Sequence, residues 1–294
     1  MQNVNMKKLV VGCGYLGQRV AAAWRSQGNA VYVLTRSKDR AESLRQLGYS
    51  PVVGDVTEPA SLDGLGCLGG LATVLFAVGY DRKATPSIRD VYVEGLRNTL
   101  TALSQNEADR FIYVSSTGVY GQSDNEWIDE ESPCQPTREG GQACLVAEEL
   151  LRSHSTLGER SVVLRLAGIY GPDRVPRIND LRDRQPLEIN ADSYLNLIHV
   201  DDACRVVLAT ESASTPNLFV VADGTPVRRR DFYNYAGELL QVPVTFALVS
   251  DHASARQRSP GGKRCRVDKL KNLVEFESQY PTYREGLHHI LGTR

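Results

Sequence analysis

The stretch that decides the fold is Leu9-Val10-Val11-Gly12-Cys13-Gly14-Tyr15-Leu16-Gly17, an apolar run followed by glycines spaced G-x-G-x-x-G. Apolar residues then recur at helical spacing, at Leu16, Val20 and Trp24. In such a strand–turn–helix unit the first glycine makes a tight turn, the second admits a pyrophosphate, and the third lets the helix pack closely. The anion lies at the helix N-terminus. We therefore expect a dinucleotide-binding turn, with cofactor contacts at Gly12, Gly14, Tyr15, Leu16 and Gly17.

Short apolar runs recur along the rest of the chain, with helical stretches between them. They are rich in branched residues on both faces, which is typical of parallel strands covered by helices on both sides. The runs lie at residues 30–34, 51–53, 73–78, 110–114, 161–166 and 218–221. This alternation predicts an α/β fold of the Rossmann type, with a doubly wound parallel sheet.

The alternation changes after residue 171, where the chain becomes rich in Arg, Asp and Pro, and the part beyond residue 221 is mixed and more polar. We expect a dinucleotide-binding Rossmann domain at residues 1–170, to which residues 195–222 return. A smaller C-terminal lobe is expected at residues 171–194 and 223–294. Ligands of open α/β sheets bind at the carboxyl ends of the strands, so this lobe is expected to face a substrate.

Composition limits the partners and the compartment. The 294 residues are 41% hydrophobic, enough for a sizeable core, and the net charge is −1, with no basic block longer than residues 228–230. We expect no nucleic-acid partner. The six cysteines form no C-x-x-C pair, which favours reduced thiols and no metal site. No apolar run approaches the ~20 residues of a membrane span, and the N-terminus lacks a signal-peptide pattern. The sequence therefore predicts a cytoplasmic protein with no membrane contact.

The end of the second expected strand distinguishes the two nicotinamide dinucleotides. An NAD site usually has Asp or Glu there, whereas this chain has Thr35-Arg36. A guanidinium offers forked donors to a 2′-phosphate, which a carboxylate would repel, so we expect NADP, with NAD as the alternative. Arg36 could instead be a surface residue or stack on the adenine. Asp55 is expected to accept from an adenine amino group, or else to cap a helix.

Four further stretches carry recognisable motifs. They read VEGLRN at 93–98, FIYVSSTGVYG at 111–121, RLAGIYGP at 165–172 and LIHVDD at 197–202. They resemble the short-chain dehydrogenase/reductase superfamily, specifically its extended NAD-dependent epimerase/dehydratase branch, over nearly the whole chain. Within it the chain is most similar to the atypical, YeeZ-like group, on the glycine spacing and on YPTYREGL at 280–287. The resemblance implies a possible homodimer. The other cofactor contacts that we expect are Val56, Ala77, Val78 and Ser115.

One part of the family pattern is missing. Catalytic members carry a Ser or Thr at the end of the fifth strand and then Y-x-x-x-K on the next helix. Ser116 matches the hydroxyl, which would hydrogen-bond a substrate oxygen, but Gly140 and Cys144 match the tyrosine and the lysine. No tyrosine occurs at residues 121–169 and no lysine at residues 84–262, so no change of register restores the pair.

The missing pair has a chemical cost. A phenol with a pKa of about 10 becomes a usable acid or base only when nearby positive charge favours the phenolate, and Cys144 cannot supply that charge. Positioned acid–base catalysis contributes about 10²- to 10⁴-fold to the rate, so hydride chemistry by the standard route of the family is expected to be slower by that order. Among substitutes, Tyr120 and Tyr170 match motif positions that are typically structural, and His154 and His199 are more typical of packed or capping residues.

Two functions remain open. The first is an NADP-dependent oxidoreductase or epimerase acting on a nucleotide-sugar-like or other small carbonyl substrate, with Ser116 polarising the oxygen. Arginines after residue 171 would hold a substrate diphosphate, or else belong to a solvated loop. The second is a non-catalytic NADP(H)-binding sensor or regulatory module. Fold alone does not choose between them, but the retained Ser116 segment and the second lobe favour the enzyme.

Overall fold

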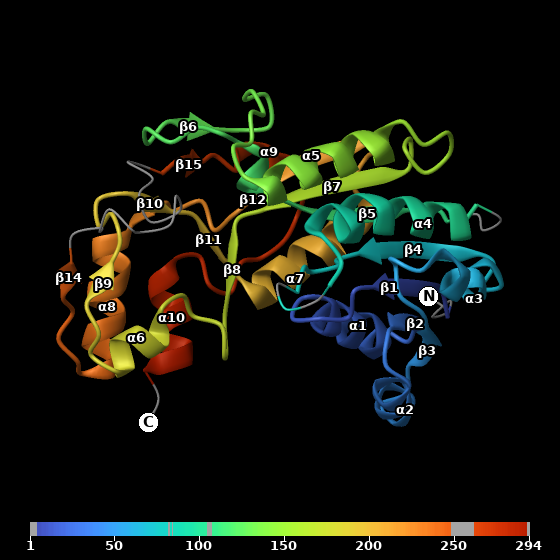
Figure 1. The fold of residues 1–294 in the computed structure, drawn as a ribbon, viewed down its shortest axis with the longest axis horizontal. Coiled ribbons are helices and arrows are strands. Elements are labelled where there is room, and N and C mark those ends of the chain that lie inside the picture. Colours follow the sequence, from blue (N-terminus) through green and yellow to red (C-terminus); the bar gives the residue numbers. More distant parts are fainter. Residues whose placement is uncertain (1–4, 82, 84, 105–107, 248–261, 293–294) are drawn as a thin grey trace. The chain divides into compact units, whose positions relative to one another are not determined.

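The computed structural model describes residues 5–81, 83, 85–104, 108–247 and 262–292. Seven strands form one sheet in the order β12-β7-β5-β4-β1-β2-β3 (Figure 1). They are β1 (Lys7–Val11), β2 (Ala30–Thr35), β3 (Ser50–Val53), β4 (Leu71–Phe76), β5 (Phe111–Ser116), β7 (Ser161–Leu166) and β12 (Asn217–Val221). The pairs β1–β2, β2–β3, β1–β4 and β4–β5 are parallel. The expected Rossmann-type sheet is confirmed, and its strand order reverses between β1 and β4.

Helices cover both faces of this sheet. They are α1 (Gly17–Ser26), α2 (Lys38–Gln46), α3 (Asp63–Gly66), α4 (Gly95–Ala102), α5 (Glu139–Arg152) and α7 (Val200–Ala209), with the short turns η1 (Pro59–Leu62), η2 (Asp90–Glu94), η3 (Thr117–Val119) and η4 (Thr210–Ser212). Val11 of β1 lies in one core cluster with Leu96 of α4 and Ala147 of α5. Successive strand residues point to opposite faces, so Val10 faces the other side, where Gly17 of α1 packs against it. Figure 1 shows α4 and α5 on one side of these strands and α1 on the other.

The chain divides into two compact units. The first is Met1–Val119, Pro136–Arg165 and Val206–Phe219, and the second is Tyr120–Gln135, Leu166–Arg205 and Val220–Arg294. These bounds differ from the expected domains at residues 120–135, 166–170, 195–205 and 220–222, which group with the second unit. No helix in the described ranges is long and apolar enough to cross a membrane.

The second unit is built from helices and very short strand pairs. The helices are α6 (Ile178–Arg182), α8 (Arg229–Leu240), α9 (Asp268–Leu273) and α10 (Tyr283–Leu291). The strands are β6 (Trp127–Ile128), β8 (Gly168–Tyr170), β9 (Leu187–Glu188), β10 (Tyr194–Leu195), β11 (Leu197–His199), β13 (Val227–Arg228), β14 (Phe246–Ala247) and β15 (Arg264–Cys265). They pair as β10–β13, β11–β8, β14–β9 and β15–β6. Tyr170, Phe232 and Leu287 lie in the separate hydrophobic core of this unit.

Candidate functional site

A cavity of about 660 Å³ lies in the first unit, where β1, β2, β3 and β4 end. This is the edge at which open α/β sheets bind ligands, next to the reversal of strand order. Nine of the expected cofactor contacts line it: Gly12, Gly14, Tyr15, Thr35, Arg36, Asp55, Val56, Ala77 and Val78. The structure thus brings together residues from four separate strand ends. Leu16, Gly17 and Ser115 do not line it.

The glycine turn has the shape that the sequence predicts. Gly12 has a φ of +96°, and a Cβ there would lie 2.5 Å from the carbonyl carbon of Ala77, so no other residue fits without displacing the backbone. A Cβ at Gly17 would lie 2.3 Å from the carbonyl oxygen of Gly12, which explains the close packing of α1 on the turn. Gly14, by contrast, has open space where a Cβ would be. The turn therefore leaves room for a ligand at Gly14 and for none at the other two glycines.

Two arginines line the cavity beyond the end of β2. Arg36 is 64% exposed at its side chain and lies 3.9 Å from the Asp55 carboxylate. Arg40, on the first turn of α2, donates a hydrogen bond of 2.9 Å to the carbonyl of Cys13 in the glycine turn. Ser37 caps the same helix by accepting from the backbone N–H of Arg40 at 3.2 Å. This edge of the cavity is positively charged and rich in donors.

Asp55 accepts hydrogen bonds within the loop that follows β3. Its Oδ1 accepts from the backbone N–H of Thr57 at 2.9 Å and from the Thr57 hydroxyl at 2.8 Å, while Oδ2 faces Arg36. One carboxylate oxygen thus holds the loop after β3 and not a helix start, because the N-cap of η1 is Glu58, and Asp55 still lines the cavity.

Several lining residues were not among the expected contacts. They are Cys13, Gln18, Leu34, Ser37, Arg40, Gly54, Thr57, Gly79, Asp81, Pro86 and Val91. The position of Arg40 could have been predicted, because Ser37 is a typical N-cap residue. A helix that starts there places Arg40 in its first turn, next to the end of the second strand. Gly79, Asp81 and Pro86 follow β4 in a segment without periodicity, so the sequence gives no signal for them. Val91 begins the helical apolar spacing that continues at Val93 and Leu96, which predicts a helix but not a contact with the cavity.

The two serines at the end of β5 have different roles. Ser115 is buried and donates a hydrogen bond to Glu148 of α5, which in turn pairs with buried Arg165 at 2.7 Å. Ser116 is half-buried, and its Oγ accepts from the backbone N–H of Gly118 at 3.0 Å. Ser115 is therefore part of a buried network rather than of the cavity wall, and Ser116 keeps its own hydroxyl proton for donation to another acceptor.

The first turns of α5 contain Gly141, where no larger side chain fits, and Cys144, whose thiol is neutral. A Cβ at Gly141 would lie 2.1 Å from the carbonyl oxygen of Gly118, so the helix packs directly on η3. Cys144 is buried, and burial, with a smaller effect of Glu148, raises the pKa of its thiol to about 11. Burial also raises the pKa of Tyr113, which shares a hydrogen bond with Cys144. This cluster holds neither a phenolate nor an ammonium near neutral pH.

Comparison with known proteins agrees with this geometry. The family model described as the NAD dependent epimerase/dehydratase family matches residues 8–222. The chain belongs to this family. Protein YeeZ of Escherichia coli K12 is 26% identical over 284 residues, which cover 94% of this chain and 97% of YeeZ.

Solved structures share the fold of this chain. A conserved protein of unknown function from Silicibacter pomeroyi is 28% identical, with a TM-score of 0.78 and 98% of each chain covered. A UDP-glucose 4-epimerase from Thermotoga maritima, solved with UDP-glucose, has a TM-score of 0.80 with 98% of each chain covered. At 17% identity this second likeness concerns the fold alone.

The tyrosines and histidines considered as substitutes for the missing catalytic pair have structural surroundings. Tyr170 is fully buried, its hydroxyl has no hydrogen-bond partner among the described residues, and burial raises its pKa. His199 is fully buried, with its ring centroid 3.8 Å from that of Tyr280. His154 accepts from the backbone N–H of Leu157 at 3.2 Å, in the turn after α5. Tyr120 is buried as well.

Proposed function

We propose that the protein binds NADP in the cavity of the first unit. The observation that carries the proposal is the pair of guanidiniums, Arg36 and Arg40, which line this cavity where an NAD site usually has a carboxylate. The glycine turn supports a bound pyrophosphate, because Gly14 leaves open space directly before α1. Arg36 would bind the 2′-phosphate, and Arg40 would hold the turn through the carbonyl of Cys13.

The proposed activity is that of an oxidoreductase or epimerase acting on a nucleotide-sugar-like or other small carbonyl substrate. When bound, the nicotinamide supplies hydride exchange. Ser116 would donate its hydroxyl proton in a hydrogen bond to the substrate oxygen, because its own Oγ already accepts from Gly118. A group other than a tyrosine–lysine pair would have to move the proton, since Gly140 and Cys144 cannot.

A second candidate is a sensor or regulatory module that binds NADP(H) without turnover. Two observations together favour this function. The cofactor cavity is complete, whereas the position of the missing lysine holds the Cys144 thiol, whose raised pKa of about 11 keeps it neutral. The two candidates share the cofactor cavity and differ only in whether a substrate is converted.

The decisive experiment combines binding and turnover on the full-length protein. Calorimetry with NADPH and NADH tests the cofactor, and Gly12→Val, which fills the turn, is the variant that should bind neither. NADPH absorbance is then followed with a panel of sugar nucleotides and small carbonyls. Ser116→Ala should abolish any turnover while Ser123→Ala, at an exposed serine, should not. Binding without turnover over the panel would support the sensor, and no binding of either dinucleotide would contradict both candidates.

We also propose a cytoplasmic location and a homodimer. None of the six cysteines forms a disulfide in the structure, as in a reducing compartment. The dimer rests only on the family resemblance, and light scattering on the purified protein tests it: a mass of one chain would contradict it.

A further inference from the structure

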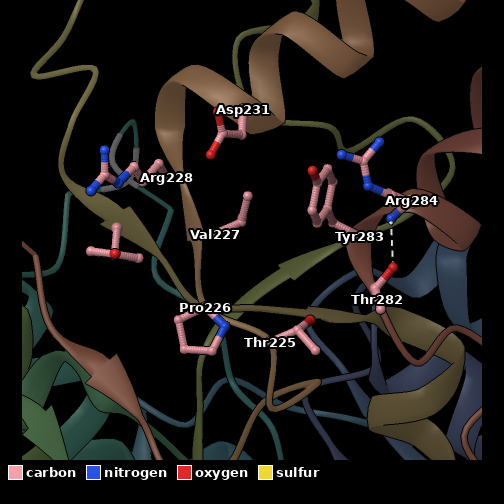
Figure 2. A pocket seen from close by; sticks show the side chains of 9 residues that line it. Thr225, Pro226, Val227, Arg228, Asp231, Thr282, Tyr283 and Arg284 are labelled. Atoms are coloured by element: carbon pink, nitrogen blue, oxygen red, sulfur yellow. Dashed lines mark hydrogen bonds between the residues drawn. The ribbon is translucent and has the colours of Figure 1, made fainter.

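A second cavity, of about 350 Å³, lies entirely within the second unit, between the first turns of α8 and α10. Figure 2 shows Arg228 and Arg284 on opposite sides of it, with Asp231 and Tyr283 between them and Thr225 below. None of its lining residues lines the dinucleotide cavity. It is therefore a separate site, to which the proposed function assigns no role.

The two arginines have no carboxylate partner within salt-bridge distance in the described part of the chain. Arg228 shares a hydrogen bond with the phenol of Tyr194, which together with nearby carboxylates raises its pKa. The guanidinium of Arg284 lies over two rings, 4.6 Å from the centroid of Tyr235 and 5.2 Å from that of Tyr283. A stacked guanidinium keeps its edge N–H groups available for an anion. The neighbouring Arg230 differs, because it pairs with Asp192 at 3.2 Å.

Several backbone donors at the two helix starts are already used. The N–H groups of Arg229 and Arg230 donate to the carbonyls of Ser193 and Ala191, at 2.9 Å and 2.8 Å. At α10 the Thr282 side chain accepts from the N–H of Arg284, as Figure 2 shows. These backbone groups are not available to an anion in this cavity, which would be held by the arginine side chains.

Asp231 restricts the chemistry of the ligand. It lines the cavity between the two arginines and forms no salt bridge among the described residues, and its charge contributes to the raised pKa of the Tyr283 phenol. A bare anion would be repelled by this carboxylate, whereas a ligand with hydroxyl groups can donate to it. The phenol of Tyr283 offers a further donor or acceptor beside it.

We propose that this cavity binds a small anion that also carries hydroxyl groups, of the sugar phosphate or sugar acid class. Arg228 and Arg284 would bind the phosphate or carboxylate, and Asp231 would accept from the hydroxyls. A volume of about 350 Å³ lies at the low end of ligand pockets, which suits a monosaccharide derivative and is too small to enclose a dinucleotide.

The test titrates the full-length protein with glucose 6-phosphate, glucuronate and glucose, followed by calorimetry. At least one of the two anionic sugars should bind, and glucose should bind at least about tenfold more weakly, since two charge-assisted contacts are lost. The double variant Arg228→Gln with Arg284→Gln should lose this binding, while Arg230→Gln, the adjacent arginine that already has a partner, should retain it. Binding by neither anionic sugar, or equal binding by glucose, would overturn the proposal.

Two further variants separate the parts of the argument. Asp231→Asn should weaken the anionic sugar relative to inorganic phosphate, and an unchanged ratio would overturn the role given to the hydroxyl groups. Gly12→Val, which closes the dinucleotide turn, should leave the binding unchanged. Loss of sugar binding in the folded Gly12→Val protein would place the ligand in the first cavity and overturn the second site. Circular dichroism of each variant confirms that it is folded.

Discussion

At the end of β2, Arg36 has two possible partners: the Asp55 carboxylate at 3.9 Å and, in the proposed complex, a 2′-phosphate. Because a phosphate carries more charge than a carboxylate and offers three acceptor oxygens, we expect it to displace Asp55. Arg36→Ala should weaken NADPH binding about tenfold or more, since hydrogen bonds to charged groups contribute about 1.5–3 kcal/mol. NADH, which lacks this phosphate, should bind almost as before. Calorimetry with both dinucleotides measures the ratio, and equal affinity of the unaltered protein for both would contradict the choice of NADP.

A different result is expected for Arg40, although it lies only four residues from Arg36 in the sequence. Its hydrogen bond to the carbonyl of Cys13 fixes the glycine turn, which both dinucleotides would use. Arg40→Ala should therefore weaken NADPH and NADH by similar factors. A loss confined to NADPH would show that Arg40, and not Arg36, binds the 2′-phosphate. Competition titrations on the two variants side by side distinguish these outcomes.

At the scale of elements, α5 is tied to two strands by charge as well as by packing. Glu148 accepts from Ser115 of β5 and pairs with Arg165 of β7, with both charged side chains less than 10% exposed. Glu148→Ala would remove the buried carboxylate with which Arg165 pairs, and breaking a buried ion pair in this way costs about 3–5 kcal/mol. Glu149 is the matched control, because it pairs with Arg152 on the solvent side of the same helix and Glu149→Ala should cost less than about 1 kcal/mol. Urea unfolding measures both, and equal losses would contradict the buried network.

The same elements show what a sequence can and cannot predict. The strands of the main sheet were predictable because parallel strands buried on both faces form unbroken apolar runs, as in β7. β4 ends at Phe76, two residues before its apolar run does, because strand pairing and not hydropathy sets the end. The two-residue strands of the second unit, such as β10 and β13, carry no periodicity and were not predicted. The pairing of Glu148 with Arg165 was hidden too, because no local pattern indicates a contact between distant residues.

At the scale of the whole molecule, the residues that the sequence predicted best are those whose role is set by the backbone. Gly12 and Gly17 are fixed by steric exclusion, and this holds for any chain that forms the same turn. The cavity in the second unit was not predicted, although Arg228 was noted as part of a basic triplet. Its site depends on α8 and α10 lying together, and they are distant in the sequence. Backbone-determined sites can thus be predicted from spacing, whereas sites made by packing of distant helices require the structure.

The stability of the molecule should depend on pH through Asp223, which follows β12. Its Oδ2 is buried without a hydrogen-bond partner in the described ranges, and burial raises its pKa from 3.8 to about 7 against the lowering effects of Thr225 and Lys271. Between these two pH values the unfolded chain loses a proton that the folded chain keeps, so stability falls as the pH rises, by at most about 1.4 kcal/mol per pH unit. Asp223→Asn cannot ionise and should lack this fall.

Urea unfolding of the Asp223→Asn protein and of the unaltered protein between pH 4.5 and 8 tests this linkage. The variant should gain relative stability steadily up to about pH 7, the pKa of Asp223, and no further above it. Asp192→Asn is the control, because Asp192 is exposed and paired with Arg230, so its difference from the unaltered protein should change little over the same range. A difference between the Asp223→Asn protein and the unaltered protein that stays constant with pH would show that Asp223 ionises normally in the folded state.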